Sequence, residues 1–322
     1  MKTVRIHEFG DESVLKYEDA PVPVPAGDEV LVKIDAIGVN RADATIRRGA
    51  YTFNPDSFPV TMGMEFAGTV AARGDGVSEF TIGQRVVSYA GTGGYAEYAV
   101  AKALRTRPIP AGIDSRTAAS VPVTFLTAWC GLVEVAAMKA GDWVLVQAGG
   151  SGVGVAAIQV CKQIGARVVV TAGNDEKCDR CIGLGADFAI NYNSRDFVPE
   201  VMGLTGGRGA DVVLEMVGGD VFTRSLEVVA PGGRFVSIGR AGGPVPDKAP
   251  ELPGGRFTTR FFVNTYLNER PEGYRHIETF LKLIGEGRYQ VIIDTIFPLS
   301  EAAGAHRRLV GREHFGKILL VP

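Results

Sequence analysis

The glycine-rich stretch that follows residue 148 has the clearest chemical pattern in the sequence. A short apolar run, 143–148, leads into it, and a segment with the apolar spacing of a helix follows. Small residues at such a turn let the backbone approach a pyrophosphate, and the N–H groups at the start of the helix favour an anion. The residues expected to bind it are Gly149, Ser151, Gly152 and Val153. Ser151 replaces the middle glycine of the G-x-G-x-x-G pattern, so the motif alone is weak evidence of dinucleotide binding. Its position at the start of a series of alternating strands and helices makes that evidence strong.

The same turn resembles the nucleophile elbow G-x-S-x-G of hydrolases. Val153 stands where that pattern has its last glycine, and no Asp and His pair downstream fits the required order. We therefore interpret Ser151 as a phosphate-binding residue and not as a nucleophile.

The end of the next expected strand, 167–171, indicates which nicotinamide cofactor binds. NAD enzymes usually place an acid there to hold the ribose 2′-hydroxyl, but this strand continues into Ala172, Gly173 and Asn174. Lys177 follows, and it is either a ligand of a 2′-phosphate or an ordinary solvated helix lysine. The residues alone leave both roles open.

The cysteines and histidines do not have the spacing of a metal site. Cys178 and Cys181 form a C-x-x-C, which suits a redox pair or half of a zinc site. No second Cys or His pair lies at a spacing that would complete a zinc site. We favour buried positions in a helix for both.

Composition limits the possible partners. The 322 residues are enough for two domains, and a net charge of -2 provides no basic field for nucleic acid or an anionic membrane. No signal peptide or membrane-spanning run is visible. We expect a cytoplasmic protein with reduced thiols, no membrane partner and no nucleic acid as its main partner.

An alternation of strands and helices predicts the domain that positions the glycine-rich turn, over residues 122–265. The expected strands are 143–148, 167–171, 188–191, 211–216 and 234–238, with a final strand over 256–265. Apolar β-branched strands separated by helices such as 153–164 indicate a parallel sheet covered on both faces, a doubly wound α/β Rossmann fold. Short alternating runs over residues 1–121 predict a mostly β domain, which residues 266–322 would complete.

Several separate segments carry a family resemblance over essentially the whole chain. They are VNRAD at 39–43, RRGAY at 47–51, GMEFAG at 63–68, AGGSGVG at 148–154, AINY at 189–192 and GKI at 316–318. Together they resemble the zinc-independent quinone oxidoreductases of the medium-chain dehydrogenase/reductase superfamily. The resemblance implies a Rossmann domain inserted in a GroES-like catalytic domain, with NADPH as the cofactor.

The resemblance also implies catalysis without metal. Asn40 matches the catalytic cysteine of the zinc-dependent relatives, and Met64 matches the histidine of their G-H-E motif. A catalytic zinc needs about three protein ligands, so no metal site is expected. Glu65 is kept, and we interpret it as a buried carboxylate.

The resemblance assigns residues to both ends of the cofactor. It places Asn40, Tyr51 and Thr127 beside the nicotinamide and the substrate, and the 2′-phosphate near Gly173, Lys177 and Tyr192. The further cofactor-binding residues that it implies are Asn174, Gly239, Phe262, Val263, Asn264 and Lys317. Thr45 stands where bacterial relatives often carry an active-site tyrosine.

The expected activity is reduction of a quinone by NADPH, because a quinone delocalises the incoming charge and needs little more than correct placement. In this interpretation the side chains of Asn40 and Tyr51 donate hydrogen bonds to the acceptor. The alternative is reduction of an activated C=C bond in an enal, enone or enoyl thioester, with Tyr51 as the visible proton donor. Some relatives are structural or RNA-binding proteins, a role that the charge balance argues against. A homodimer is expected, with the strand within 256–265 pairing with its twin.

Overall fold

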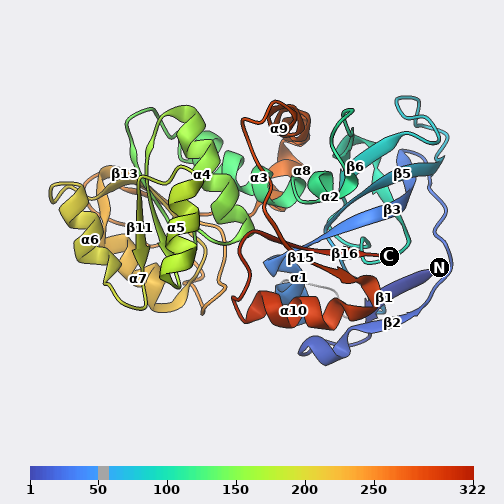
Figure 1. The fold of residues 1–322 in the computed structure, drawn as a ribbon, viewed down its shortest axis with the longest axis horizontal. Coiled ribbons are helices and arrows are strands. Elements are labelled where there is room, and N and C mark those ends of the chain that lie inside the picture. The colour runs from blue at the N-terminus through green and yellow to red at the C-terminus, as the bar shows by residue number, and fades with distance from the viewer. Residues whose placement is uncertain (50–57) are drawn as a thin grey trace. The chain divides into compact units, whose positions relative to one another are not determined.

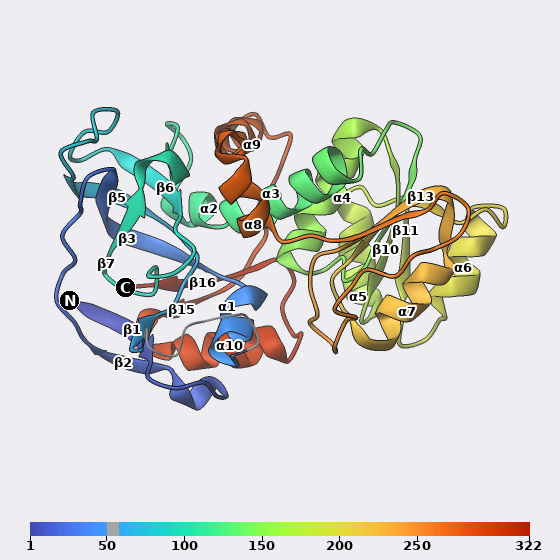
Figure 2. The same ribbon diagram turned by 180° about the vertical axis from the view of Figure 1, so that it is seen from behind.

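The computed structural model describes residues 1–49 and 58–322, which divide into two compact units. One unit comprises Met1–Leu126 and Leu267–Pro322, and we call it the catalytic unit. The other comprises Thr127–Tyr266, and we call it the nucleotide unit. Figures 1 and 2 label their elements from two sides.

The nucleotide unit is built on a six-stranded sheet in the order β11-β10-β9-β12-β13-β14, in which every neighbouring pair is parallel. This is the doubly wound Rossmann order, so the expected fold class is confirmed. The strands are β9 Trp143–Val146, β10 Arg167–Ala172, β11 Phe188–Asn191, β12 Ala210–Glu215, β13 Val229–Ser237 and β14 Phe257–Arg260. All six residues of β12 are buried, as continuous apolar strands covered on both faces require.

Helices alternate with these strands and cover the sheet. They are α4 Gly152–Ile164, α5 Asp175–Gly183, α6 Phe197–Leu204 and α7 Gly219–Glu227. In Figure 1, α4 and α5 lie in front of the sheet. A core cluster that includes Leu145, Val213 and Phe235 joins the sheet to Phe197 of α6 and Phe222 of α7.

The expected final strand over 256–265 is wrong in its second half. Only Phe257–Arg260 is extended, and a helix, α8, runs over Val263–Glu269. Val263 and Leu267 are buried while the two residues after Val263 are exposed, which is the i, i+4 spacing of a helix. Val263 and Asn264 therefore lie in the first turn of α8.

The catalytic unit contains two sheets. A three-stranded sheet has the order β2-β1-β4, and a larger one has the order β15-β16-β3-β5-β6-β8, with β7 paired to β3. The strands are β1 Lys2–Ile6, β2 Lys16–Asp19, β3 Glu29–Val39, β4 Val60–Thr61, β5 Glu65–Arg73, β6 Arg85–Tyr89, β7 Tyr98–Lys102, β8 Thr106–Pro108, β15 Ile293–Pro298 and β16 Lys317–Val321. The C-terminal strand β16 pairs with β3, so the end of the chain completes a sheet begun near its start.

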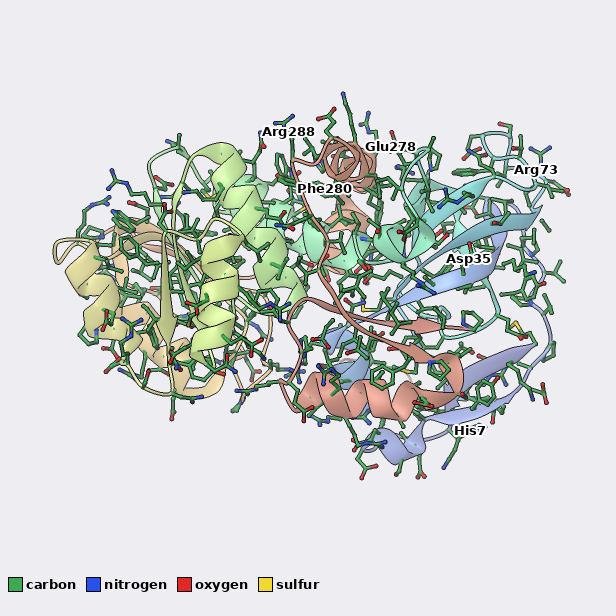
Figure 3. All side chains as sticks on the ribbon, viewed as in Figure 1. His7, Asp35, Arg73, Glu278, Phe280 and Arg288 are labelled. Atoms are coloured by element: carbon green, nitrogen blue, oxygen red, sulfur yellow. The ribbon has the colours of Figure 1, made fainter. Side chains whose placement is uncertain are left out.

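The helices of the catalytic unit are short. They are α1 Arg41–Arg47, α2 Ser115–Ala119, α9 His276–Gly285 and α10 Ala302–Val310, with 3₁₀ turns η1 Glu12–Val14, η3 Ala103–Arg105, η5 Pro271–Arg275 and η6 Leu299–Glu301. Helix α3, Pro122–Trp129, continues into a π-helical turn, η4 Cys130–Val135. Phe280 of α9, labelled in Figure 3, packs on Phe125 of α3 with ring centroids 5.5 Å apart. In the described residues we find no helix with the length and apolar character needed to span a bilayer.

Candidate active site and cofactor-binding loop

Three strands of the catalytic unit bring a buried polar cluster together. Gly38 near the end of β3 is paired with Glu65 at the start of β5, and Val39 is paired with Ile318 on β16. This register places the side chains of Asn40, Glu65 and Lys317 in contact. Glu65 is fully buried, and Asn40 and Lys317 are 6% and 4% exposed.

The ammonium of Lys317 donates to three protein oxygens. Its Nζ lies 2.6 Å from Glu65 Oε1, 2.7 Å from Asn40 Oδ1 and 3.0 Å from the Val39 carbonyl oxygen. Because an ammonium has three hydrogens, these contacts use its whole donor capacity. The resemblance placed Lys317 among the cofactor-binding residues, whereas here its charged group is buried against its own unit.

The amide of Asn40 is held in one orientation. Its Nδ2 donates to Glu65 Oε1 at 2.9 Å and to the Gly38 carbonyl at 3.3 Å, while its Oδ1 accepts from Lys317. Both amide hydrogens are thus bonded to protein atoms, and a second lone pair on Oδ1 is the remaining capacity. In this geometry Asn40 has no N–H left for a substrate oxygen, contrary to the role expected from the sequence.

Glu65 also anchors the start of α3. Its Oε2 accepts from the backbone N–H of Val123 at 2.7 Å, where a carboxylate stabilises the positive end of a helix. A Cβ at Gly38 would overlap with Glu65 Oε1, so this glycine leaves room for the carboxylate. Thr127 lies one turn further along α3 and is 7% exposed. No residue in the described ranges forms a hydrogen bond with its hydroxyl.

A second set of buried groups lies at the first turn of α1. Asp43 Oδ2 accepts from the backbone N–H of Asn40 at 2.8 Å and from the Tyr95 hydroxyl at 3.3 Å, and that hydroxyl lies 3.0 Å from His306 Nε2. Burial raises the pKa of Asp43 to about 7. Burial, with help from nearby arginines, lowers the pKa of His306 to about 3. None of these three side chains has a role that was expected from the sequence.

The glycine-rich loop has the geometry of an anion-binding turn. Ser151 caps α4, its Oγ accepting from the Gly154 N–H at 3.0 Å, and no described residue accepts from the N–H groups of Gly152 and Val153. A Cβ at Gly149 would lie 2.9 Å from Val170 Cβ, and one at Gly154 would overlap with backbone oxygens of the loop. Close packing therefore requires these glycines, and two N–H groups remain for an anion.

The residues expected to hold a 2′-phosphate lie at the carboxyl ends of β10 and β11. A Cβ at Gly173 would lie 2.8 Å from the Tyr192 hydroxyl, and the Tyr192 side chain is exposed. Asn174 caps α5 by accepting from the Lys177 N–H at 2.8 Å. The nearest acid, Asp175, accepts from the Asn191 side chain at 2.8 Å. The structure thus brings Gly173, Asn174, Lys177 and Tyr192 to one edge of the sheet.

The remaining predicted residues follow the last two strands at the same edge. Gly239 comes after β13, where a Cβ would lie 3.0 Å from the Met216 carbonyl oxygen. Phe262 is partly exposed, with the Arg260 guanidinium 5.3 Å from its ring centroid. Ligands of open parallel sheets bind beyond this edge. Tyr51 lies outside the described residues.

The cysteines are buried in the structure. Cys178 and Cys181 are 7% and 0% exposed on α5, and burial raises the pKa of Cys181 to about 12. Within residues 1–49 and 58–322, no group of three or more His, Cys, Asp and Glu side chains is placed to hold a metal ion.

Comparison with known proteins identifies the family of the chain. Residues 26–111 match the alcohol dehydrogenase GroES-like domain, and residues 152–265 match a domain described as zinc-binding dehydrogenase. The quinone oxidoreductase of Rattus norvegicus is 31% identical over 324 residues, covering 100% of this chain and 98% of that protein. A phenolphthiocerol/phthiocerol polyketide synthase of Mycobacterium tuberculosis is 35% identical over 98% of this chain, which spans 14% of that much longer protein.

Solved structures are similar over the whole chain. The Escherichia coli quinone oxidoreductase complexed with NADPH superposes with a TM-score of 0.94 at 31% identity, covering 100% of both chains. The CurK enoyl reductase has a TM-score of 0.89 at 27% identity, covering 99% of this chain and 98% of that one. The chain belongs to the quinone oxidoreductase family of the medium-chain dehydrogenase/reductase superfamily.

Proposed function

We propose that this protein reduces quinones with NADPH. The observation that carries the proposal is the carboxyl edge of β10, where the Tyr192 hydroxyl lies against Gly173, Lys177 stands in the first turn of α5, and the nearest acid, Asp175, is bound by Asn191. That edge suits a phosphate better than a ribose 2′-hydroxyl. The names of the rat and Escherichia coli relatives supply the substrate class.

The nucleotide unit fits NADPH in two places. The N–H groups of Gly152 and Val153, at the positive end of α4, would hold the pyrophosphate. Lys177 and Tyr192 would hold the 2′-phosphate through charge-assisted and neutral hydrogen bonds. When bound, NADPH supplies a hydride from its nicotinamide ring.

The residues of the buried polar cluster, Asn40, Glu65 and Lys317, then have orienting roles. Asn40, Glu65 and Lys317 bond one another and form a fixed polar surface. The Thr127 hydroxyl is the donor left to stabilise charge on an acceptor oxygen. Tyr51 remains a predicted acceptor-binding residue.

Reduction of an activated C=C bond is the second candidate, favoured by the likeness to the CurK enoyl reductase. Turnover of NADPH on a benzoquinone, an enone and an enoyl thioester separates the two. We expect the quinone to give the highest kcat/KM, and faster turnover of the enone or thioester would favour the alternative.

Thr127→Val tests the proposed donor, with the exposed Thr223→Val on α7 as the matched control. We expect a loss of quinone turnover of about 100-fold for Thr127→Val, the lower end for an oxyanion donor, with unchanged NADPH affinity. Equal turnover of the two variants would remove Thr127 from the site.

A homodimer is also proposed. Strand β14 lies at an edge of the six-stranded sheet, where its backbone can pair with a second copy. A cytoplasmic location suits the four free cysteines, since thiols stay reduced there. Light scattering at micromolar concentration tests the dimer, and a monomeric mass would contradict it.

A further inference from the structure

The ion pair between Lys317 and Glu65 is a costly feature of the catalytic unit. Their side chains are 5% and 0% exposed, with Nζ and Oε1 2.6 Å apart. Removing two charges from water is so unfavourable that a buried pair is weak support for stability and is often replaceable by apolar residues. Its presence calls for a role other than holding the fold together.

Both oxygens of the Glu65 carboxylate bind groups next to predicted substrate residues. Oε1 accepts from Lys317 and from the Asn40 amide, and Oε2 accepts from the Val123 N–H at the first turn of α3. Thr127 lies one turn beyond Val123 on the same helix. One carboxylate therefore links the Asn40 side chain to the start of α3.

Lys317 and Glu65 also decide which way the Asn40 amide points. An amide has a donor end and an acceptor end of nearly the same shape. Lys317 can only donate and the carboxylate of Glu65 can only accept, so a flipped amide would face a donor with its N–H and an acceptor with its oxygen. A single orientation remains.

We propose that Lys317 and Glu65 are positioning residues, which fix the Asn40 amide and the start of α3 through one shared carboxylate and thereby place the acceptor. The inference rests on the proposed function, because it takes Asn40 to border the acceptor. Neither residue needs to touch the substrate.

The test compares Lys317→Met, Glu65→Gln and the double variant. Lys317→Met removes the donor to Asn40 and leaves Glu65 buried without a counter-ion, so the melting temperature should fall. The double variant contains no buried charge at this position, and its introduced glutamine amide would present an N–H group of its own to Asn40, which favours the flipped amide. We expect the double variant to regain stability without regaining the native amide orientation.

Three readouts keep the outcomes separate. Quinone kcat/KM should fall about 100-fold in Lys317→Met and in the double variant, the scale of a misplacement of about 1 Å. The Kd for NADPH should stay within about twofold, since its proposed ligands lie in the other unit. The side-chain amide NMR signals of Asn40 should shift in both variants. The matched control is Lys102→Met, whose ammonium forms an exposed pair with Asp28, and it should change none of these.

The outcomes also distinguish the inference from the function. Recovery of full turnover and of native Asn40 signals in the double variant would show that the pair only stabilises the fold. A parallel loss of NADPH affinity would place its effect elsewhere. If none of the acceptors tested supports NADPH oxidation by the wild-type protein, the proposed function is refuted. The amide signals would still decide whether Lys317 and Glu65 orient Asn40.

Discussion

Asp43 and His306 lead to a prediction about the pH dependence of stability. In the folded catalytic unit the pKa of Asp43 is about 7 and that of His306 about 3. In an unfolded chain these groups have pKa values near 3.8 and 6.5. Between about pH 4 and 6.5, therefore, the folded state holds its proton on Asp43, and the unfolded state holds it on His306.

The signs of the two contributions are opposite. Asp43 has a raised folded pKa, so its contribution to stability is lost as pH rises from about 4 to 7. His306 has a lowered folded pKa, so its contribution is lost as pH falls from about 6.5 to 3. Each slope is about 1.4 kcal/mol per pH unit and each full span about 4–5 kcal/mol. Because the number of bound protons is the same in both states, the two slopes cancel in the wild type.

Substituting one residue at a time should expose each slope. As pH rises from 4.5 to 6.5, the stability of Asp43→Asn relative to wild type should increase by about 3 kcal/mol. Over the same rise, the stability of His306→Gln relative to wild type should decrease by about as much. The double variant should run parallel to wild type. The groups facing the pair include Glu65, which raises the pKa of Asp43, and Lys317, which lowers it; taking differences from wild type reduces their effect.

Urea unfolding at several pH values measures these differences. Both tryptophans lie in the nucleotide unit, so circular dichroism or hydrogen exchange of β3 amides should be used to follow the catalytic unit. If the stability of both single variants runs parallel to wild type across pH 4.5–6.5, the folded state does not hold its proton on Asp43 and the prediction is refuted. A curve for Asp43→Asn that alone runs parallel to wild type would mean that Asp43 is already ionised in the folded protein over this range.

Three further predictions concern the cofactor and metals. Gly154→Ala should weaken NADPH binding at least tenfold because its Cβ would overlap with loop backbone, whereas Gly183→Ala on α5, where a Cβ meets nothing within 4 Å, should not; equal affinities would contradict this. Lys177→Ala should weaken NADPH binding by about 1.5–3 kcal/mol and leave NADH binding unchanged, and equal loss for both cofactors would remove Lys177 from the phosphate site. Exhaustive chelation should leave turnover unchanged, since the resemblance matches Asn40 and Met64 to two zinc ligands of the zinc-dependent relatives; stoichiometric zinc whose removal abolishes turnover would overturn this.

The sequence predicted the parallel sheet well because its central strands β9, β10 and β12 are almost entirely buried and read as apolar runs. The strand β13 begins five residues earlier than expected, at Val229, because Pro231-Gly232-Gly233 resembles a turn. The expected strand over 256–265 combined β14 with the first turn of α8. Phe261, Phe262 and Val263 fit either element by composition, and only the burial of Leu267 one turn later distinguishes them.

The glycine-rich loop was visible in the sequence because its residues are adjacent. The cluster of Asp43, Tyr95 and His306 was not, since its hydrogen bonds span 52 and 211 positions. One local signal was available. Asn40 followed three residues later by an acid is the pattern of a helix N-terminus with a capping box, and it predicts the Asp43 contact to the Asn40 backbone.

The hydrogen-bond donors of Asn40 and Lys317 are all used within the protein, and this affects which acceptors the site can reduce. Each side-chain N–H group of these two residues donates to a protein oxygen. Within the described ranges, this cluster therefore has no charged hydrogen-bond donor left for a substrate oxygen. A ketone or aldehyde collects its new charge on one oxygen and needs strong donors, each worth up to several kcal/mol. A quinone spreads that charge over its ring and two oxygens, and an enone spreads it less. If the donor is a single neutral hydroxyl, as proposed for Thr127, the acceptors should rank as quinone, then enone, then simple ketone. A ketone reduced as fast as a quinone would show that a stronger donor serves the site.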